Sequence, residues 1–249
     1  MAKASSGRSS SPPPGGSKRR GDAKRSTFQK DPLGSRPASV EGLLSEGLRS
    51  LGLSVTREQV TLLSTHLEEL ACWAGRLSVT GYRTDRARAV HLTLDSAILV
   101  TLLPPTSGVL LDIGSGAGFP GVVIKILRQD LLVVLIEANR KRGNFLRHLQ
   151  RRLGLADCEI LIDRAESLQA PRAKRADTVT MRAVAGLDAA LGLSEPFLRP
   201  GGSLLLPLAP GVKKPLLPAG WEGEICTVPL PFSTLTRRIL RAHKRGNLD

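Results

Sequence analysis

The feature that most constrains this 249-residue chain is a cluster of glycines directly after an apolar run. Residues 109–113 are apolar except for Asp112, and four of the next eight residues, 114–121, are glycine. Alternating glycines allow a sharp turn and let a ligand approach main-chain N–H groups closely. A helical pattern begins at Pro120, which suits the first turn of a helix, where free N–H groups favour anions. The stretch predicts a strand, a ligand-binding loop and a helix, with a nucleotide-type cofactor as the first hypothesis.

The glycine loop fits two cofactor motifs. Residues 116–121 match the dinucleotide pattern G-x-G-x-x-G, and Glu137 lies where the ribose-binding acid of that pattern belongs, which favours NAD. Residues 112–118 also have the form D-x-G-x-G-x-G, which resembles motif I of the class I S-adenosylmethionine-dependent methyltransferases. The loop alone leaves both cofactors, and a purely structural turn, as open interpretations.

Composition limits the class of protein and its partners. The net charge of +14 favours a polyanionic partner, first a nucleic acid and second an anionic membrane surface. The sequence has no long apolar run and no hydrophobic leader, so we expect no membrane span and no secretory signal. Its three cysteines and four histidines show no metal-ligand spacing. We therefore expect reduced thiols, no metal and a cytoplasmic location.

Three segments follow one another along the chain. Residues 1–38 are rich in Ser, Pro and Gly and carry nine Lys or Arg against two acids, so we expect a disordered basic tail. That tail would be an electrostatic tether to RNA, a solvated extension without a fixed role, or an organelle transit peptide. Residues 39–103 have helical periodicity and predict an N-terminal helical extension. Residues 104–249 predict a Rossmann-like domain.

Three helices are expected in the helical extension. Apolar residues at three-and-four spacing mark a helix over residues 40–51 and a second one that begins at Thr56. Gln59 follows three residues later, which is a capping-box arrangement. A third helix, over residues 89–103, is expected to stop before Pro104.

Strand and helix patterns alternate beyond the glycine loop, which is typical of a parallel sheet with crossover helices. The expected strands cover residues 131–136, 159–162, 178–181 and 203–206, with a final antiparallel pair over 225–228 and 239–243. The expected helices cover residues 140–153, which Asn139 can cap, and 187–198. The predicted fold class is therefore α/β.

Ligands of such sheets bind outside the carboxyl ends of the strands. The first strand ends in the glycine loop, and the second ends in Glu137, whose carboxylate could accept both ribose hydroxyls of an adenosine. The third strand ends near residues 163–166, placed to meet an adenine ring. We expect these three strand ends to form one site.

Four segments in the same order and spacing carry a family resemblance: L-D-I-G-S-G-A-G-F-P-G at 111–121, E-A-N-R-K-R at 137–142 with Phe145-Leu146, R-A-E at 164–166 and R-A-V-A at 182–185. Together they resemble the small-subunit ribosomal RNA guanine-N7 methyltransferase family, also called glucose-inhibited division protein B. The resemblance implies a class I methyltransferase fold, S-adenosylmethionine as cofactor and methylation of N7 of one guanine in 16S rRNA. By the same match, the cofactor would be held by Gly114, Phe119, Glu137, Ala138, Asn139, Ala165, Glu166 and Arg182.

The sequence departs from the family pattern outside these cofactor motifs. Trp73-Ala74 and residues 78–80 stand where the family usually has W-N and N-L-T. Leu92 replaces a histidine, with His91 one position away, and Leu208-Ala209 replaces a Lys-Gly pair. The departures leave the cofactor assignment standing and bear on the RNA target.

The implied reaction does not require the protein to add or remove a proton. Guanine N7 has an in-plane lone pair and no proton to lose, so we expect no catalytic acid or base. N7 faces the deep, narrow groove of A-form RNA, so the target must lie in a loop or be extruded. Phe119 and Tyr82 are candidates to stack on it, although core packing is favoured for both.

Basic residues indicate where RNA would bind. Residues 140–142 place three cations at the start of a helix, against the helix dipole, which indicates a nearby anion. They are expected to form one RNA face of a monomeric protein together with Arg147, Arg151, Arg152, Arg237, Arg238, Arg241, Lys244 and Arg245.

Alternative functions remain from two classes. One is a methyltransferase that acts on another RNA base or on a small molecule. The other is a catalytically idle RNA-binding or assembly factor with the same fold. A nicotinamide oxidoreductase is disfavoured by the motifs that follow the glycine loop.

Overall fold

The computed structural model describes residues 39–77, 81–106, 108–170, 175–182, 186–209, 211–212 and 216–245. The expected basic tail, residues 1–38, lies outside these ranges. None of the helices within them has the length and hydropathy that crossing a bilayer requires.

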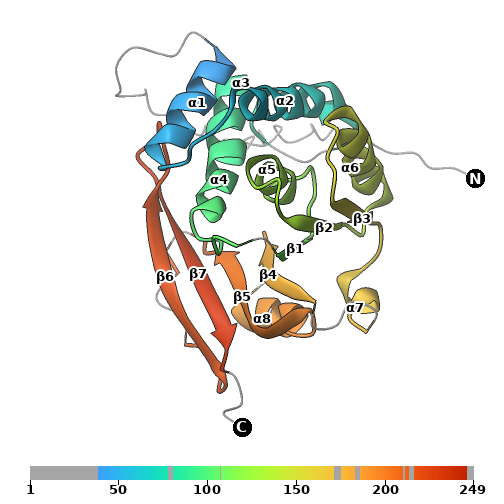
Figure 1. Cartoon of the computed structure of the whole chain (residues 1–249), viewed down its shortest axis with the longest axis vertical. Helices are drawn as coiled ribbons and strands as arrows, with labels where there is room; N and C mark the ends of the chain where they lie inside the picture. The colour runs from blue at the N-terminus through green and yellow to red at the C-terminus, as the bar shows by residue number, and fades with distance from the viewer. Residues whose placement is uncertain are drawn as a thin grey trace, which may run out of the picture. The chain divides into compact units, whose positions relative to one another are not determined.

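A seven-stranded sheet forms the centre of the fold, in the order β3-β2-β1-β4-β5-β7-β6 (Figure 1). The strands are β1 (Val109–Ile113), β2 (Leu132–Ile136), β3 (Cys158–Leu161), β4 (Ala176–Met181), β5 (Leu198–Pro207), β6 (Trp221–Pro229) and β7 (Thr236–Lys244). The first five pair in parallel, and β7 is antiparallel to both β5 and β6. The predicted α/β fold class and the final antiparallel pair are confirmed.

Helices cover both faces of this sheet (Figure 1). One face carries α1 (Val40–Ser50), α2 (Arg57–Leu77), α3 (Asp85–Arg88), the π-helix η1 (Ala89–Leu94), α4 (Asp95–Val100), α5 (Gly121–Leu127) and α6 (Arg140–Arg152). The other face carries α7 (Ala165–Leu168) and α8 (Leu187–Ser194). Because both faces are covered, the central strands are continuous apolar runs.

The core divides into two apolar clusters, one on each face of the sheet. Leu110 and Val133 pack in the cluster shared with α1, α2, α4, α5 and α6. Their neighbours Leu111 and Val134 pack in the cluster shared with α7 and α8. This alternation follows from the two-residue period of a strand.

The start of α2 has the expected capping box. The Thr56 N–H donates to Gln59 Oε1 at 3.0 Å, and the Gln59 N–H donates to Thr56 Oγ1 at 3.2 Å. The Gln59 side-chain amide also donates to the Ile126 carbonyl at 2.9 Å. One residue thus caps α2 and joins it to the end of α5.

Two helix boundaries differ from the sequence prediction. The helix expected over residues 187–198 ends at Ser194, because the Phe197 carbonyl accepts from the N–H groups of Arg175 and Ala176 and so joins the sheet. The helix expected over 89–103 begins at Asp85 with α3, continues through η1 and α4, and ends at Val100. In the first case a main-chain partner distant in sequence ends the helix earlier than local periodicity predicts. In the second case a change of helix type shifts the boundaries.

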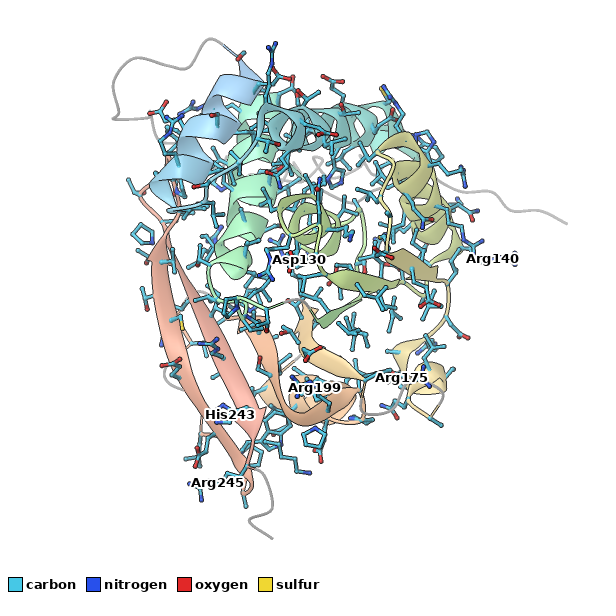
Figure 2. The ribbon with its side chains drawn as sticks, in the orientation of Figure 1. Asp130, Arg140, Arg175, Arg199, His243 and Arg245 are labelled. Atoms are coloured by element: carbon cyan, nitrogen blue, oxygen red, sulfur yellow. The ribbon has the colours of Figure 1, made fainter. Side chains whose placement is uncertain are left out.

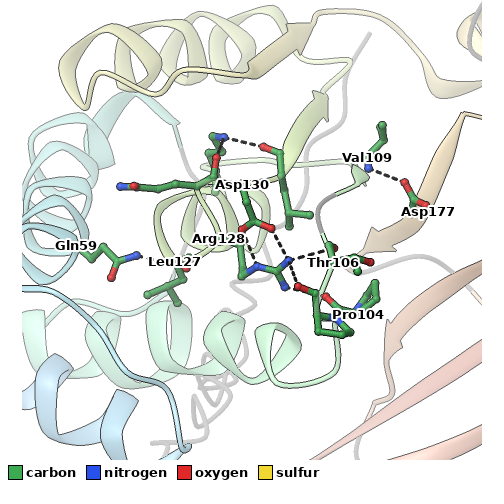
Figure 3. Close-up of polar contacts among 12 residues, drawn as sticks. Gln59, Pro104, Thr106, Val109, Leu127, Arg128, Asp130 and Asp177 are labelled. Atoms are coloured by element: carbon green, nitrogen blue, oxygen red, sulfur yellow. Dashed lines mark hydrogen bonds and ion pairs between the residues drawn. The ribbon is translucent and has the colours of Figure 1, made fainter.

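Arg128 fixes the loop that enters β1 from the side opposite the glycine loop (Figure 3). Its guanidinium donates to the carbonyls of Pro104, Pro105 and Thr106 at 2.9, 3.4 and 3.3 Å. It also forms an ion pair with Asp130 at 2.7 Å. These contacts hold the segment that leads into β1.

Candidate cofactor site

The glycine loop folds back on the end of β2. The N–H groups of Gly114 and Ser115 donate to the Ile136 carbonyl at 2.8 and 3.1 Å. Gly114, Gly116 and Gly118 have φ values of 76°, 58° and 89°, which side chains rarely allow. Apart from Gly114 and its two chain neighbours, no described atom lies within 4 Å of the place a Cβ would occupy at Gly114. The main chain of the loop is therefore open to a ligand at that point.

Asp112 holds the loop against the start of α5. Its side chain is fully buried, and Oδ2 accepts from the Gly121 N–H at 2.9 Å. The Ser115 hydroxyl donates to the Asp112 carbonyl at 2.8 Å. Burial raises the pKa of the Asp112 carboxyl to about 7. The Asp112 side chain therefore fixes the end of the glycine loop at Gly121.

Glu137 joins the end of β2 to the glycine loop. Its Oε2 accepts from the Gly116 N–H at 2.9 Å, and its Oε1 accepts from the Asn139 N–H at 2.8 Å. The side chain is buried, with 5% of its surface exposed. Each carboxylate oxygen retains a further lone pair. The group is therefore held in place and still has acceptor capacity for hydroxyl groups.

Asn139 caps α6, as the sequence predicts. Its Oδ1 accepts from the N–H groups of Lys141 and Arg142 at 3.0 and 3.2 Å. Ala138, between Glu137 and Asn139, is exposed. The cap leaves the amide nitrogen of Asn139 as the group that could meet a ligand.

Ala165 and Glu166 begin α7, just after β3. β3 pairs with β2, and the Glu137 N–H donates to the Leu161 carbonyl at 3.0 Å. Ala165 is buried, whereas Glu166 is exposed. The third strand end therefore lies beside the second.

A cavity of about 360 Å³ opens over the glycine loop. Its lining residues are Leu70, Gly81, Tyr82, Leu92, Gly114, Ser115, Gly116, Ala117, Phe119, Arg142 and Arg182. Of the eight residues the resemblance implies, Gly114, Phe119 and Arg182 line it, and Glu137 is hydrogen-bonded to its wall through Gly116. The other four, Ala138, Asn139, Ala165 and Glu166, are not part of this lining.

Arg182 follows β4 and is oriented by Asp95, a residue that sequence reasoning did not select. Asp95 Oδ2 pairs with the Arg182 guanidinium at 2.8 Å, and Oδ1 pairs with Arg237 of β7 at 2.5 Å. The Asp95 side chain is 10% exposed. No local pattern in the sequence could have linked these three residues. Residues 183–185 of the R-A-V-A segment lie outside the described part of the chain.

His66 supports the loop from α2 and was also missed. Its Nε2 lies 2.8 Å from the Ala117 carbonyl, and its ring stacks on Phe119 with centroids 4.4 Å apart. Burial lowers the pKa of His66 to about 4, so the ring is neutral and Nε2 donates. Its place on the apolar stripe between Leu63 and Leu70 of α2 is the sequence signal that could have revealed it.

The basic residues expected to form one RNA face lie at two different edges of the sheet. α6 packs beside β3, whereas β7 lies next to the opposite edge strand, β6. Figure 2 shows Arg140 far from His243 and Arg245. The expectation of a single face is therefore wrong for the far end of β7, because strand order rather than chain order decides which helices and strands are neighbours. Arg237, at the other end of β7, is joined through Asp95 to Arg182, which lines the same cavity as Arg142.

The two basic clusters also differ in their ion pairs. On β7 and just beyond it, Arg237 pairs with Asp95, Arg241 with Glu224, Lys244 with Glu195, and Arg245 with Glu222. On α6, Arg152 pairs with Glu69. Arg140, Lys141, Arg142, Arg147 and Arg151 form no ion pair with the described residues. Arg238 of β7 also forms no ion pair with the described residues, so the larger share of unpaired positive charge in these two clusters is on α6.

A second hollow, of about 1,040 Å³, lies away from the glycine loop. It is lined by the start of β5, by β6 and β7, and by Pro104. None of the eight residues implied by the resemblance lines it. The volume of a hollow therefore does not by itself identify the cofactor site.

Comparisons with known proteins agree with the geometry. Residues 59–208 match the family model described as rRNA small subunit methyltransferase G. A curated protein of that name from Chloroflexus aggregans is 37% identical over 68% of this chain and 72% of its own length. One from Xanthomonas campestris pv. campestris is 32% identical over 84% of this chain and 97% of its own length. One from Stenotrophomonas maltophilia is 35% identical over 75% of this chain and 86% of its own length. The chain therefore belongs to the rRNA small subunit methyltransferase G family.

Proposed function

We propose that this protein transfers a methyl group from S-adenosylmethionine to N7 of a guanine in 16S rRNA. The observation that carries the proposal is the link between the glycine loop and the end of β2, where Glu137 accepts a hydrogen bond from Gly116, a residue that lines the cavity. The family name of the curated relatives, rRNA small subunit methyltransferase G, supports the substrate class.

The residues present fit S-adenosylmethionine. Glu137 supplies acceptors for a ribose diol, and Gly114 leaves its main chain accessible. Arg142 and Arg182 line the cavity and suit a carboxylate. We propose that Ala138, Asn139, Ala165 and Glu166 extend the site toward the adenine, with Phe119 supporting the loop. When bound, the cofactor supplies an electrophilic methyl group on a sulfonium.

The cavity wall suits a nucleophile that needs no deprotonation. Its described lining contains two arginines and one tyrosine but neither a carboxylate nor a histidine. Guanine N7 attacks through a lone pair and loses no proton, so the protein has to align the reactants rather than remove a proton. We expect the acceleration of methyl transfer to come from the exclusion of water and from the alignment of the two reactants over the glycine loop.

Methyl transfer from tritium-labelled S-adenosylmethionine to purified 16S rRNA, followed by nucleoside analysis, tests this function. We expect the label in 7-methylguanosine. Label in another nucleoside would support the alternative of a different RNA base. Cofactor binding without transfer to rRNA, either naked or in a small-subunit particle, would support an idle assembly factor.

Replacement of Glu137 by Gln tests the cofactor site. A glutamine has one carbonyl oxygen to accept where the two oxygens of Glu137 now bind Gly116 and Asn139. We expect the dissociation constant for S-adenosylmethionine, measured by calorimetry, to rise by about tenfold or more, since a bond to a charged group contributes roughly 1.5–3 kcal/mol. Glu222→Gln, an acid of β6 on the second hollow, is the matched control. Equal affinity in both variants would remove Glu137 from the site.

We also propose that the protein acts in the cytoplasm, as a monomer and without a metal. A single sedimentation boundary at about 27 kDa and full activity after chelation would support these two properties.

A further inference from the structure

Three charged side chains meet at the edge of the cavity over the glycine loop. Arg182 Nη2 donates to Asp95 Oδ2 at 2.8 Å, and Arg237 Nε donates to Asp95 Oδ1 at 2.5 Å. Asp95 begins α4, Arg182 follows β4, and Arg237 lies near the start of β7. One carboxylate thus pairs with two guanidinium groups, and we call these three side chains the Asp95 cluster.

Strand pairing brings Arg237 to the same edge of the sheet as the glycine loop. Ile113, the last residue of β1, is paired with Met181, the last residue of β4. Pro207, the last residue of β5, is paired with Ile239 of the antiparallel strand β7. The first residues of β7 therefore lie at the carboxyl ends of the parallel strands, where ligands of such sheets bind.

The Asp95 cluster is largely shielded from solvent. The side chains of Asp95, Arg237 and Arg182 are 10%, 22% and 30% exposed. The space that they border together with Pro120 has a volume of about 10 Å³, which is room for about one water molecule at most. Charges that are weakly screened by water interact more strongly with each other. The balance of charge in the cluster therefore affects an ion bound beside it.

Arg182 is the member of the Asp95 cluster that reaches the cavity. It lines the cavity, whereas Asp95 and Arg237 are not part of the described lining. A guanidinium has five N–H donors, so Arg182 can donate to Asp95 from Nη2 and to the carboxylate of a ligand from its other N–H groups.

The second arginine determines how much positive charge Arg182 presents to a ligand. Asp95 and Arg182 alone would form a neutral pair, with both carboxylate oxygens drawn to one guanidinium. Arg237 pairs with Oδ1 and balances the charge of Asp95, so that Asp95 holds Arg182 through Oδ2. The cluster of two guanidinium groups and one carboxylate then has a net charge of +1, which attracts an anion in the cavity.

We propose that Asp95 and Arg237 are positioning residues that hold Arg182 toward the carboxylate of S-adenosylmethionine and leave it a net positive charge, an inference that rests on the proposed function. Arg237 acts on the cofactor through Asp95 and Arg182, from a strand at the C-terminal end of the described chain. The Asp95 cluster thereby favours ligands that carry this carboxylate over ligands that lack it.

Calorimetry with two ligands that differ in one group tests this role. S-adenosylmethionine and its decarboxylated form share the adenosine and the sulfonium, and only the first has the carboxylate. We define the discrimination ratio as the Kd of the decarboxylated form divided by the Kd of S-adenosylmethionine. We expect Arg237→Gln to lower this ratio by about tenfold, close to the lower end of what a hydrogen bond to a charged group contributes.

Two further variants accompany Arg237→Gln. Arg237→Lys keeps a positive charge beside Asp95, so we expect it to recover most of the discrimination ratio. Arg199 also pairs with an aspartate, Asp177, but is not part of the cavity lining, so Arg199→Gln should leave the ratio unchanged. Both affinities are measured on the same variant, so a purely structural defect would weaken the two ligands alike and would not change their ratio.

An unchanged ratio in Arg237→Gln, an equal fall in Arg199→Gln, or an equal weakening of both ligands would overturn the inference. A wild-type protein that binds the two ligands equally would also overturn it, because the cavity would then not recognise the carboxylate. A wild-type protein that binds neither ligand would instead overturn the proposed function and the inference with it.

Discussion

Two buried ionisable side chains hold the glycine loop by its main chain. Asp112 accepts from the Gly121 N–H, and His66 contacts the Ala117 carbonyl. Burial disfavours the charged form of both, so the pKa of the acid is raised to about 7 and that of the base is lowered to about 4. The loop therefore rests on groups that favour their neutral forms.

The raised pKa of Asp112 predicts a pH effect on stability. Between the unfolded pKa, near 3.8, and about 7, the folded state keeps a proton that the unfolded state releases. The contribution of Asp112 to the free energy of unfolding is therefore complete below about pH 4 and is lost as the pH rises to about 7. Asp112→Asn cannot titrate, so the stability of the wild type relative to this variant should fall by roughly 1–4 kcal/mol across that range.

Urea unfolding of the wild type and of Asp112→Asn at about pH 5 and about pH 8 measures this difference. The comparison cancels the titration of all other groups. A difference that is the same at both pH values would show that the folded-state pKa of Asp112 is not raised.

Single elements are positioned by polar contacts at their ends. Arg128, at the end of α5, binds the carbonyls of residues 104–106 and Asp130, and its side chain is 16% exposed (Figure 3). Arg128→Ala leaves these carbonyls without their donor, so we expect the free energy of unfolding to fall by about 1–3 kcal/mol. Chemical denaturation checks this value.

The control for Arg128 is Arg199→Ala. Arg199 pairs with Asp177 but is 52% exposed, so its loss should cost less than about 1 kcal/mol. Equal costs for the two variants would mean that the contacts of Arg128 add nothing beyond a surface ion pair.

The exposed cations of α6 predict where RNA binds. Arg147 and Arg151 are exposed, four residues apart and without an ion pair to the described residues. Changing both to Gln should weaken RNA binding and lower the slope of log affinity against log salt by about 1–2, since each phosphate contact contributes about 0.7–0.9. Filter binding at several salt concentrations measures the slope.

The matched control removes the same charge from β7. Arg241→Gln with Lys244→Gln takes away two cations that pair with Glu224 and Glu195. We expect little change in the slope. An equal change in both double variants would show that total charge, and not the α6 surface, governs RNA binding.

At the scale of the whole molecule, charge is divided between the tail and the body. Residues 1–38 carry nine basic and two acidic residues, a net +7 that is half of the +14 of the chain. Deleting them should leave the melting temperature and cofactor affinity unchanged and should weaken RNA binding mainly at low salt. Identical RNA affinity of the 39–249 chain and the full chain at low salt would exclude the tether hypothesis.

Much of the fold follows from local sequence signals. Gln59 three residues after Thr56 predicts the start of α2, Asn139 predicts the start of α6, and the apolar runs predict the parallel strands. These features depend on residues within one or two turns of each other. The prediction that a helix reaches residue 198 was wrong because it used only local residues. The hydrogen-bond partner that ends this helix lies on β4, far away in the sequence.

The sequence by itself determined the glycine loop, the α/β class and the acid that borders the loop, since turn chemistry and periodicity are encoded locally. Only the tertiary structure decided that Asp95 orients Arg182, that Tyr82 faces the cavity, and that α6 and β7 lie at different edges of the sheet. Those relations join residues far apart in the chain. They depend on the order in which strands pair and helices pack, which no local pattern specifies.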